Sequence, residues 1–267
     1  MELDGPKSKL RWALKHLKAV ERKCETLLES EPFDISSEFD LDTGSHILSF
    51  RVTEQETFHE LGLMVGDVVH NARSALDQAA WLIACRSNPV ERLWVPRIAR
   101  KIAFPMVSEG EDFPRHKLMP FIADDAKAVL EGLQPYNGGD TPTAIKRLDE
   151  LWNIDKHRVI HDSMAELDIS GVEFITTVLS AEDTTDGFPE TTHFPVENVE
   201  DGTKIAAIRF RSERGPPFTQ VDVKGKPSVL IAFGSGDVLL TAGAILGLLA
   251  QTAIALSKIE ALPETPV

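Results

Sequence analysis

The sequence predicts an α+β protein, and three patterns along the chain lead to this fold class. Apolar residues recur at helical spacing through residues 6–29 and again through about 55–87. From Leu167 to about residue 233 the period changes to that of short antiparallel strands. A long apolar segment at 238–256 then predicts a last, buried helix. Helices, then a run of strands, then a closing helix are typical of an α+β chain.

We expect one domain over residues 1–267, because a chain of this length can bury a sizeable core. Its helical part is predicted to be made of long antiparallel helices and to span about 1–165. The strand-rich part spans about 166–235, with an antiparallel sheet mainly at 167–233, and the closing helix spans about 236–260.

The N-terminal elements follow from local signals. Pro6 and Pro32 bracket the first helix, since proline is tolerated at a helix start and common after its end. Two alternating runs, "FDISSEFDLD" and "SHILSFRVTE", predict a hairpin whose turn contains Gly44. The second helix should run from about Gln55 to about Ser87.

Proline-rich sequence at 88–122 predicts a loop, and "DDAKAVLEGLQPY" predicts a short helix. Thr141 or Thr143 should cap a further helix through "AIKRLDELWNIDKHRVIHD". Strands are expected in "GVEFITTVLS", "TKIAAIRFRS", "FTQVDVKG" and "PSVLIAFG". Asp237 is the predicted N-cap of the last helix.

The net charge of −14 arises from 42 acidic against 28 basic residues, so the chain as a whole repels a phosphate backbone. A small local basic site remains compatible with this balance. The two cysteines suggest no disulfide framework. The first residues carry charge where a signal peptide would be apolar, and we therefore expect a reducing, cytoplasmic compartment.

The apolar segment 238–256 has two interpretations. It is close to bilayer-spanning length, and Gly243 and Gly247 have the spacing of membrane helix pairs. However, it contains Gln251 and Thr252, and a core helix that is apolar all round gives the same pattern. We expect a core helix and no membrane partner, and a C-terminal anchor is the alternative.

A first group of polar residues lies on the second helix. His70, Arg73, Asp77 and Trp81 fall along one stripe, with Asn71 beside it. Arg73 and Asp77 are four residues apart and can form an ion pair across one turn. A solvated helix face explains this pattern as well as a site does.

A second group lies in "LWNIDKHRVIH". The helix pattern places Asp155 in the middle of an apolar arc, where a carboxylate needs a cation or N–H donors. Arg158 is the local candidate, and Arg73 on the other helix is our hypothesis for the partner. Replacing Asp155 with alanine should then destabilise the fold strongly. His157 and His161 supply only half of a zinc site, so we expect no metal and no cofactor.

These two segments resemble those of an uncharacterised bacterial family that is especially common in actinobacteria. Its members have "NLRSALDH" on one helix and "N-x-DKHR" on a later one; here they read "NARSALDQ" (71–78) and "NIDKHR" (153–158). The segments "IAFPM" and "LQPY" also resemble the family, and the match spans about residues 60–165.

The first motif is similar to that of HEPN domains, helical modules in which an Arg and a following His cleave RNA in a dimer. The resemblance implies a HEPN-like helical core, a homodimer and, for an enzyme, a metal-independent ribonuclease. Arg73 matches, but Gln78 stands where those nucleases have His, and glutamine is no general acid or base. His70 or His157 could replace it only if the fold brings either one beside Arg73.

Three functions are therefore expected as alternatives. The first is a polar pocket that binds RNA or a phosphate-bearing nucleotide, with degenerate or absent catalysis. The second is a non-enzymatic domain in which the same residues form a buried polar network. The third is a membrane-anchored protein. The candidate catalytic residues are Arg73, His70, Asp77 and His157, and the candidate ligand or network residues are Asn71, Asn153, Asp155, Lys156 and Arg158.

Overall fold

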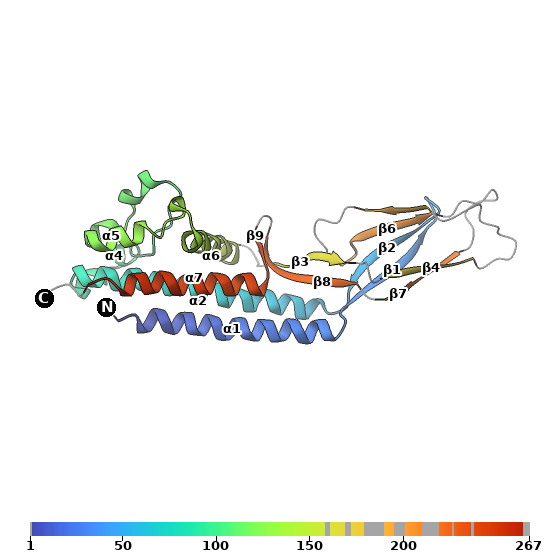
Figure 1. Ribbon diagram of the computed structural model, residues 1–267, viewed down its shortest axis with the longest axis horizontal. Helices are drawn as coiled ribbons and strands as arrows, with labels where there is room; N and C mark the ends of the chain where they lie inside the picture. Colours follow the sequence, from blue (N-terminus) through green and yellow to red (C-terminus); the bar gives the residue numbers. More distant parts are fainter. Residues whose placement is uncertain are drawn as a thin grey trace. The chain divides into compact units, whose positions relative to one another are not determined.

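The computed structural model describes residues 2–157, 161–168, 172–178, 190–194, 201–209, 219–225, 227–235 and 238–263. It combines long helices with antiparallel sheets, which confirms the α+β class (Figure 1). The chain divides into two compact units. Unit 1 holds Met1–Arg22, Leu61–His161 and Phe233–Val267, and unit 2 holds Lys23–Glu60 and Asp162–Ala232. The expectation that the whole chain is one domain stays a prediction.

The long helices among the described residues are α1 (Asp4–Glu29), α2 (Gln55–Ser87), α6 (Asp140–His157) and α7 (Ala242–Glu260). The predictions for α1 and α2 are confirmed, and α2 runs unbroken through Gly62 and Gly66. The predicted loop at 88–122 contains short elements: α3 (Val90–Leu93), α4 (Pro96–Ala99), η1 (Gly110–Arg115) and η2 (Met119–Phe121). The predicted short helix after it is confirmed as α5 (Asp124–Glu131), and η3 (Pro135–Asn137) follows.

Within unit 1 these helices pack side by side. Lys9 Nζ of α1 donates to Asn71 Oδ1 of α2 at 3.2 Å, and His16 Nδ1 lies 3.8 Å from Asp67 Oδ2. Because the partner number falls as the α1 number rises, the two helices are antiparallel, as predicted. Thr141 Oγ1 of α6 donates to Gln251 Oε1 of α7 at 2.7 Å. Their facing sides bury the apolar core of the unit.

Both ends of α6 differ from the prediction. The helix begins at Asp140, so Thr141 lies inside its first turn and Thr143 follows it; neither is the cap. It ends at His157, and His161 begins strand β3. This strand neighbours β8, a strand far along the chain. Helical periodicity carries no information about such a distant partner. His157 and His161 are therefore not a pair at helical spacing, and the expectation of no metal stays a prediction.

The start and the burial of α7 also correct the prediction. Val238–Leu240 form strand β9, and the N-cap of α7 is Thr241, whose hydroxyl accepts from the Ala244 N–H at 3.2 Å. One side of α7 is buried, but Leu246 and Ile254 are exposed. Among the described residues α7 is long and apolar enough to span a membrane, and 39% of its apolar window is buried. The expectation of burial all round is thus wrong.

The strands of the described residues form three sheets, where one was predicted. Their bounds are β1 (Phe33–Asp40), β2 (Ser45–Val52), β3 (His161–Asp168), β4 (Glu173–Val178), β5 (Glu190–His193), β6 (Lys204–Arg209), β7 (Thr219–Lys224), β8 (Ser228–Ser235) and β9 (Val238–Leu240). The sheet orders are β1-β2-β6-β5, β3-β8-β9 and β4-β7. The predicted N-terminal hairpin is confirmed, but β2 pairs with β6, so the sheet is not confined mainly to 167–233. Strands β3, β5 and β9 were not predicted.

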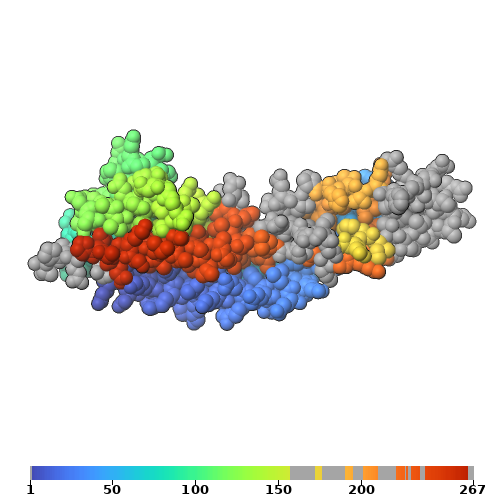
Figure 2. Space-filling view, in the orientation of Figure 1, coloured from blue at the N-terminus to red at the C-terminus, as the bar shows by residue number. Residues whose placement is uncertain are grey.

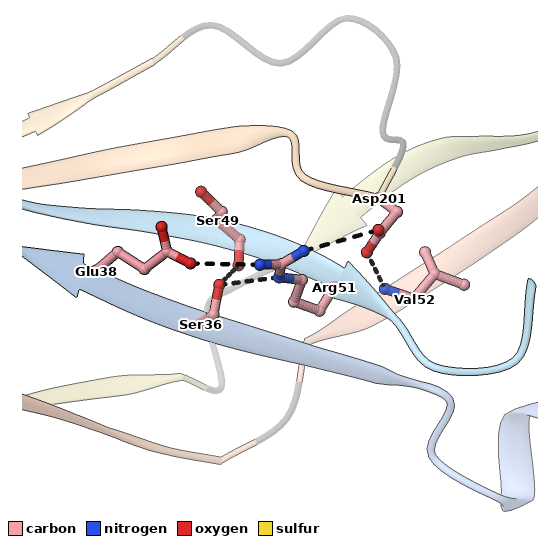
Figure 3. Close-up of polar contacts among 6 residues, drawn as sticks. All are labelled: Ser36, Glu38, Ser49, Arg51, Val52 and Asp201. Carbon is pink, nitrogen blue, oxygen red and sulfur yellow. Dashed lines mark hydrogen bonds and ion pairs between the residues drawn. The ribbon is translucent and has the colours of Figure 1, made fainter.

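The largest sheet, in unit 2, carries a polar cluster around Arg51 of β2 (Figure 3). Its Nε donates to Ser36 Oγ at 3.2 Å and its Nη2 to Glu38 Oε1 at 3.4 Å, both on the neighbouring β1. Its Nη1 lies 3.8 Å from Asp201, whose Oδ1 accepts from the Val52 N–H at 2.9 Å. The Arg51 side chain is largely exposed, and cross-strand ion pairs of this kind stabilise a sheet by a few tenths of a kcal/mol, up to about 1 kcal/mol.

Candidate functional site: a buried arginine cluster

Arg73 lies on the side of α2 that faces α6 and the loop after α4. It is only 6% exposed, which is unusual for an arginine and requires compensating partners. Three of these partners, Phe104, Asp149 and Trp152, were not among the predicted site residues. We call Arg73, Asp77, Phe104, Asp149 and Trp152 the Arg73 cluster.

Each nitrogen of the Arg73 guanidinium lies close to a protein oxygen. Nη1 lies 3.0 Å from Asp77 Oδ1, and Nε lies 3.1 Å from Asp149 Oδ1 of α6. The N–H directions at these two nitrogens miss good hydrogen-bond geometry, so both contacts are ion pairs. Nη2 donates a hydrogen bond to the Phe104 carbonyl at 3.2 Å.

Asp77 completes a clamp on the backbone of Phe104. Its Oδ1 accepts from the Phe104 N–H at 2.9 Å, so Arg73 and Asp77 together satisfy both polar backbone groups of this residue. The Phe104 ring is buried. The "RSALD" part of the first motif therefore fixes the "IAFPM" segment onto α2, and loop backbone can be buried only when its polar groups are paired.

Aromatic rings close the cluster on the remaining sides. The Arg73 Cζ atom lies 5.3 Å from the centre of the Trp152 ring and 6.0 Å from that of Phe104. Lys156 Nζ lies 4.7 Å from the centre of the same Trp152 ring. A guanidinium over an aromatic face is attracted to it, most strongly where water is excluded. Arg73 is thus enclosed by carboxylates, a carbonyl and rings.

Asp149 is the acidic partner most removed from solvent. Its side chain is 19% exposed, against 33% for Asp77. Burial raises the pKa of the Asp149 carboxyl, whereas Arg73 and the Asn153 amide, which donates to Asp149 Oδ2 at 3.1 Å, oppose the rise. The charge of Arg73 is therefore what allows a carboxylate at this position.

A second contact holds the same loop to the helical unit. Gln134, in the "LQPY" segment, is fully buried, and its Oε1 accepts from the Val107 N–H at 3.1 Å. Its Nε2 donates to the Leu130 carbonyl at 2.9 Å. The first motif and the "LQPY" segment thus bind backbone groups of the same loop, at Phe104 and Val107, and these contacts hold the loop in the fold.

Asp155 does not pair with Arg73, which corrects our hypothesis for its partner. It lies against α2 at Gly66, on the N-terminal side of Arg73, where a Cβ built on that glycine would stand 2.5 Å from Asp155 Oδ1. The two helices do pack together as expected, but the carboxylate at Arg73 comes from Asp149, almost two turns earlier. A Cβ at position 66 would require the Asp155 carboxylate to shift.

Asp155→Asn is expected to stabilise the protein at neutral pH and to change little in acid. Burial raises the pKa of the Asp155 carboxyl above the ordinary 3.8, with His70 opposing and Asp67 adding to the rise. A raised carboxyl pKa contributes stability in acid that is lost as pH rises through the folded value. The asparagine variant should therefore gain up to about 1 kcal/mol between about pH 3 and pH 7. Urea denaturation across this range checks it, and a variant less stable than wild type at pH 7 contradicts it.

The remaining predicted residues lie around the cluster or away from it. His70 is exposed, and buried Asn71 donates to the Asp67 carbonyl at 2.7 Å. Asn153 and Lys156 are exposed on α6. The His157 side chain and all of Arg158 lie outside the described residues. Gln78 lies near Gly5 of α1, with its Oε1 3.2 Å from where a Cβ on that glycine would stand. The described part of the chain contains no group of three metal-ligating side chains.

Three members of the Arg73 cluster, Phe104, Asp149 and Trp152, were not predicted as site residues from the sequence. Asp149 had a usable signal, because Ile145, Leu148 and Trp152 are buried or half-buried neighbours at helical spacing. A carboxylate inside that stripe needs a cation as much as Asp155 does. Phe104 had none, since it takes part through its backbone groups, and Gln134, which lies outside the cluster, had none because its side chain binds backbone groups of a loop.

Comparison with known proteins found no relative: no family model, no curated protein and no solved structure matches the chain. The resemblance to the bacterial family and to HEPN domains therefore stays a prediction from the two motifs.

Proposed function

We propose that the protein is a non-enzymatic binding domain in which the Arg73 cluster is a structural centre. The observation that carries this proposal is the near-complete burial of Arg73 among Asp77, Asp149 and the Phe104 carbonyl. A ribonuclease arginine must reach a phosphate at the moment of reaction, and this guanidinium is already neutralised by two carboxylates. Its separation from bulk water supports a role in holding α2, α6 and the loop together.

The composition of the motif supports the same proposal. Gln78 replaces the histidine that a HEPN-type nuclease needs, and its side chain cannot move a proton. His70, the described histidine nearest in sequence to Arg73, interacts with Asp155 and is exposed to solvent. A pocket for RNA or a nucleotide would need Arg73 to leave both carboxylates, which costs several kcal/mol.

An RNA assay tests the proposal against a nuclease or RNA-binding function. Purified protein is incubated with 5′-labelled single-stranded RNA from about pH 5 to 9, with and without EDTA, beside Arg73→Lys and His70→Ala. We expect no cleavage by any of the three proteins and equal, weak retention of RNA. Cleavage or binding by the wild type that is lost in a folded Arg73→Lys variant would overturn the proposal.

A further inference from the structure

An open groove of about 420 Å³ lies between α1 and α7, and both helices belong to unit 1. On the face shown in Figure 2, α7 in red lies along α1 in blue. The groove is lined from α1 by Lys7, Leu10, Arg11 and Leu14, and from α7 by Leu246, Leu249, Ala250, Ala253, Leu256 and Ser257. No acidic side chain lines it.

The groove is apolar because each helix presents a leucine stripe to it. Ala250 and Ala253 are too small to fill the space between the leucines of α1 and α7, so a hollow remains. Leu246 at its edge is 42% exposed. An apolar hollow of a few hundred Å³ with a small number of polar groups has the size and character of a small-ligand site.

Charge is confined to one end of the groove. Lys7 forms an ion pair with Glu260 near the end of α7, and α7 runs opposite to α1 (Figure 1). Lys7 and Arg11 therefore lie toward the C-terminal end of α7, whereas Leu14 and Leu246 lie toward its start. Arg11 donates to Ser8 Oγ at 2.8 Å, and no carboxylate pairs with it among the described residues.

Basic side chains outnumber acidic ones at this end of α1, although the chain as a whole is acidic. Lys7, Lys9 and Arg11 follow Asp4 there, in a protein of net charge −14. Lys7 is paired with Glu260, so Arg11 is the groove-lining cation that has no carboxylate partner among the described residues. Such a local excess attracts an anionic group to the groove and disfavours a cationic one.

We propose that this groove binds a single-chain anionic amphiphile of the fatty-acid type. The carboxylate lies at Arg11, and the alkyl chain extends past Leu10 and Leu14 toward Leu246. The groove shares no residue with the Arg73 cluster, so failure of this inference leaves the proposed function intact, and the reverse also holds.

The test is isothermal titration calorimetry of the full chain with decanoate, dodecanoate and tetradecanoate, each below its micelle-forming concentration. Each methylene buried in the groove should tighten binding about fourfold until the groove is full. Dodecanol and dodecyltrimethylammonium have the same alkyl chain without the negative charge, and both should bind at least about tenfold more weakly than dodecanoate.

Matched variants locate the site. Ala253→Trp fills the groove and should abolish binding, whereas Ile254→Trp places the same tryptophan side chain at an exposed position outside it and should not. Arg11→Glu should weaken dodecanoate binding at least about tenfold. Arg22→Glu makes the same charge change on α1 outside the groove and should have little effect.

Circular dichroism melting identifies a variant that fails to fold. Arg11→Glu changes a surface residue, so the site can still be tested if Ala253→Trp does not fold. Dodecanoate binding that is absent, or equal for the cationic amphiphile, overturns the proposal. So does binding that survives both Ala253→Trp and Arg11→Glu. Binding only to anionic phospholipid vesicles, with none to free dodecanoate, also overturns it and assigns the basic face of α1 to a membrane surface.

Discussion

Arg73→Ala is expected to lower the free energy of unfolding by about 3 to 5 kcal/mol, the range for removing one partner of a buried ion pair. The substitution leaves the buried Asp149 carboxylate without its cation and the Phe104 carbonyl without its donor. It also removes the contact of the guanidinium with the Trp152 ring. Urea denaturation followed by circular dichroism measures the change.

The matched control for this prediction is Arg22→Ala. Arg22 is also on a long helix, but it is exposed and its Nε only donates to the Lys18 carbonyl at 3.1 Å. Its loss should change stability by less than about 0.5 kcal/mol. An Arg73→Ala protein whose stability lies within about 1 kcal/mol of wild type would be incompatible with the partners described for Arg73.

Gly66→Ala is expected to destabilise the protein by about 1 to 3 kcal/mol, as overpacking does between packed helices. Alanine is the better helix former, so propensity alone predicts a gain of about 1 kcal/mol. The new Cβ, however, would stand 2.5 Å from Asp155 Oδ1 and 3.3 Å from its Cγ. Thermal and urea denaturation decide which effect is larger.

Two further variants make the Gly66 prediction specific. Gly247→Ala adds the same methyl group to α7 where nothing lies within 4 Å, and it should stabilise by about 0.5 to 1 kcal/mol. Asp155→Ala in the Gly66→Ala background removes the atom that the methyl group meets and should restore most of the lost stability. If the double variant is no more stable than Gly66→Ala alone, the destabilisation by Gly66→Ala has a cause other than contact with Asp155.

The helices were predictable because their signals are local. Leucine spacing and the flanking prolines located α1, and the apolar arc of α2 located its full length in spite of Gly66. The strand partners were not predictable, since β3 and β9 owe their strand form to neighbouring β8 along its two sides. The start of α7 moved from about 236 to Ala242 for this reason.

Two members of the candidate site were predictable, but its other members and its pairing were not. Arg73 and Asp77 were found from their spacing, and the packing of α2 against α6 followed from the need to pair a core-side carboxylate. The sequence pattern favoured Asp155 as the partner of Arg73, because Asp155 lies in the middle of the apolar arc. Which carboxylate meets Arg73 depends on the axial offset of two helices, which places Asp149 at Arg73 and Asp155 beside Gly66.

A double-mutant cycle between Arg73 and Asp149 measures whether the cluster is structural. Arg73→Met, Asp149→Leu and the double variant are compared with wild type by urea denaturation at pH 7. We expect each single variant to be strongly destabilised, the double variant to recover much of the loss, and a coupling energy above about 1.5 kcal/mol. A coupling energy below about 0.5 kcal/mol, with both single variants close to wild type, would contradict a structural Arg73 cluster and return Arg73 to the candidate ligand-binding residues.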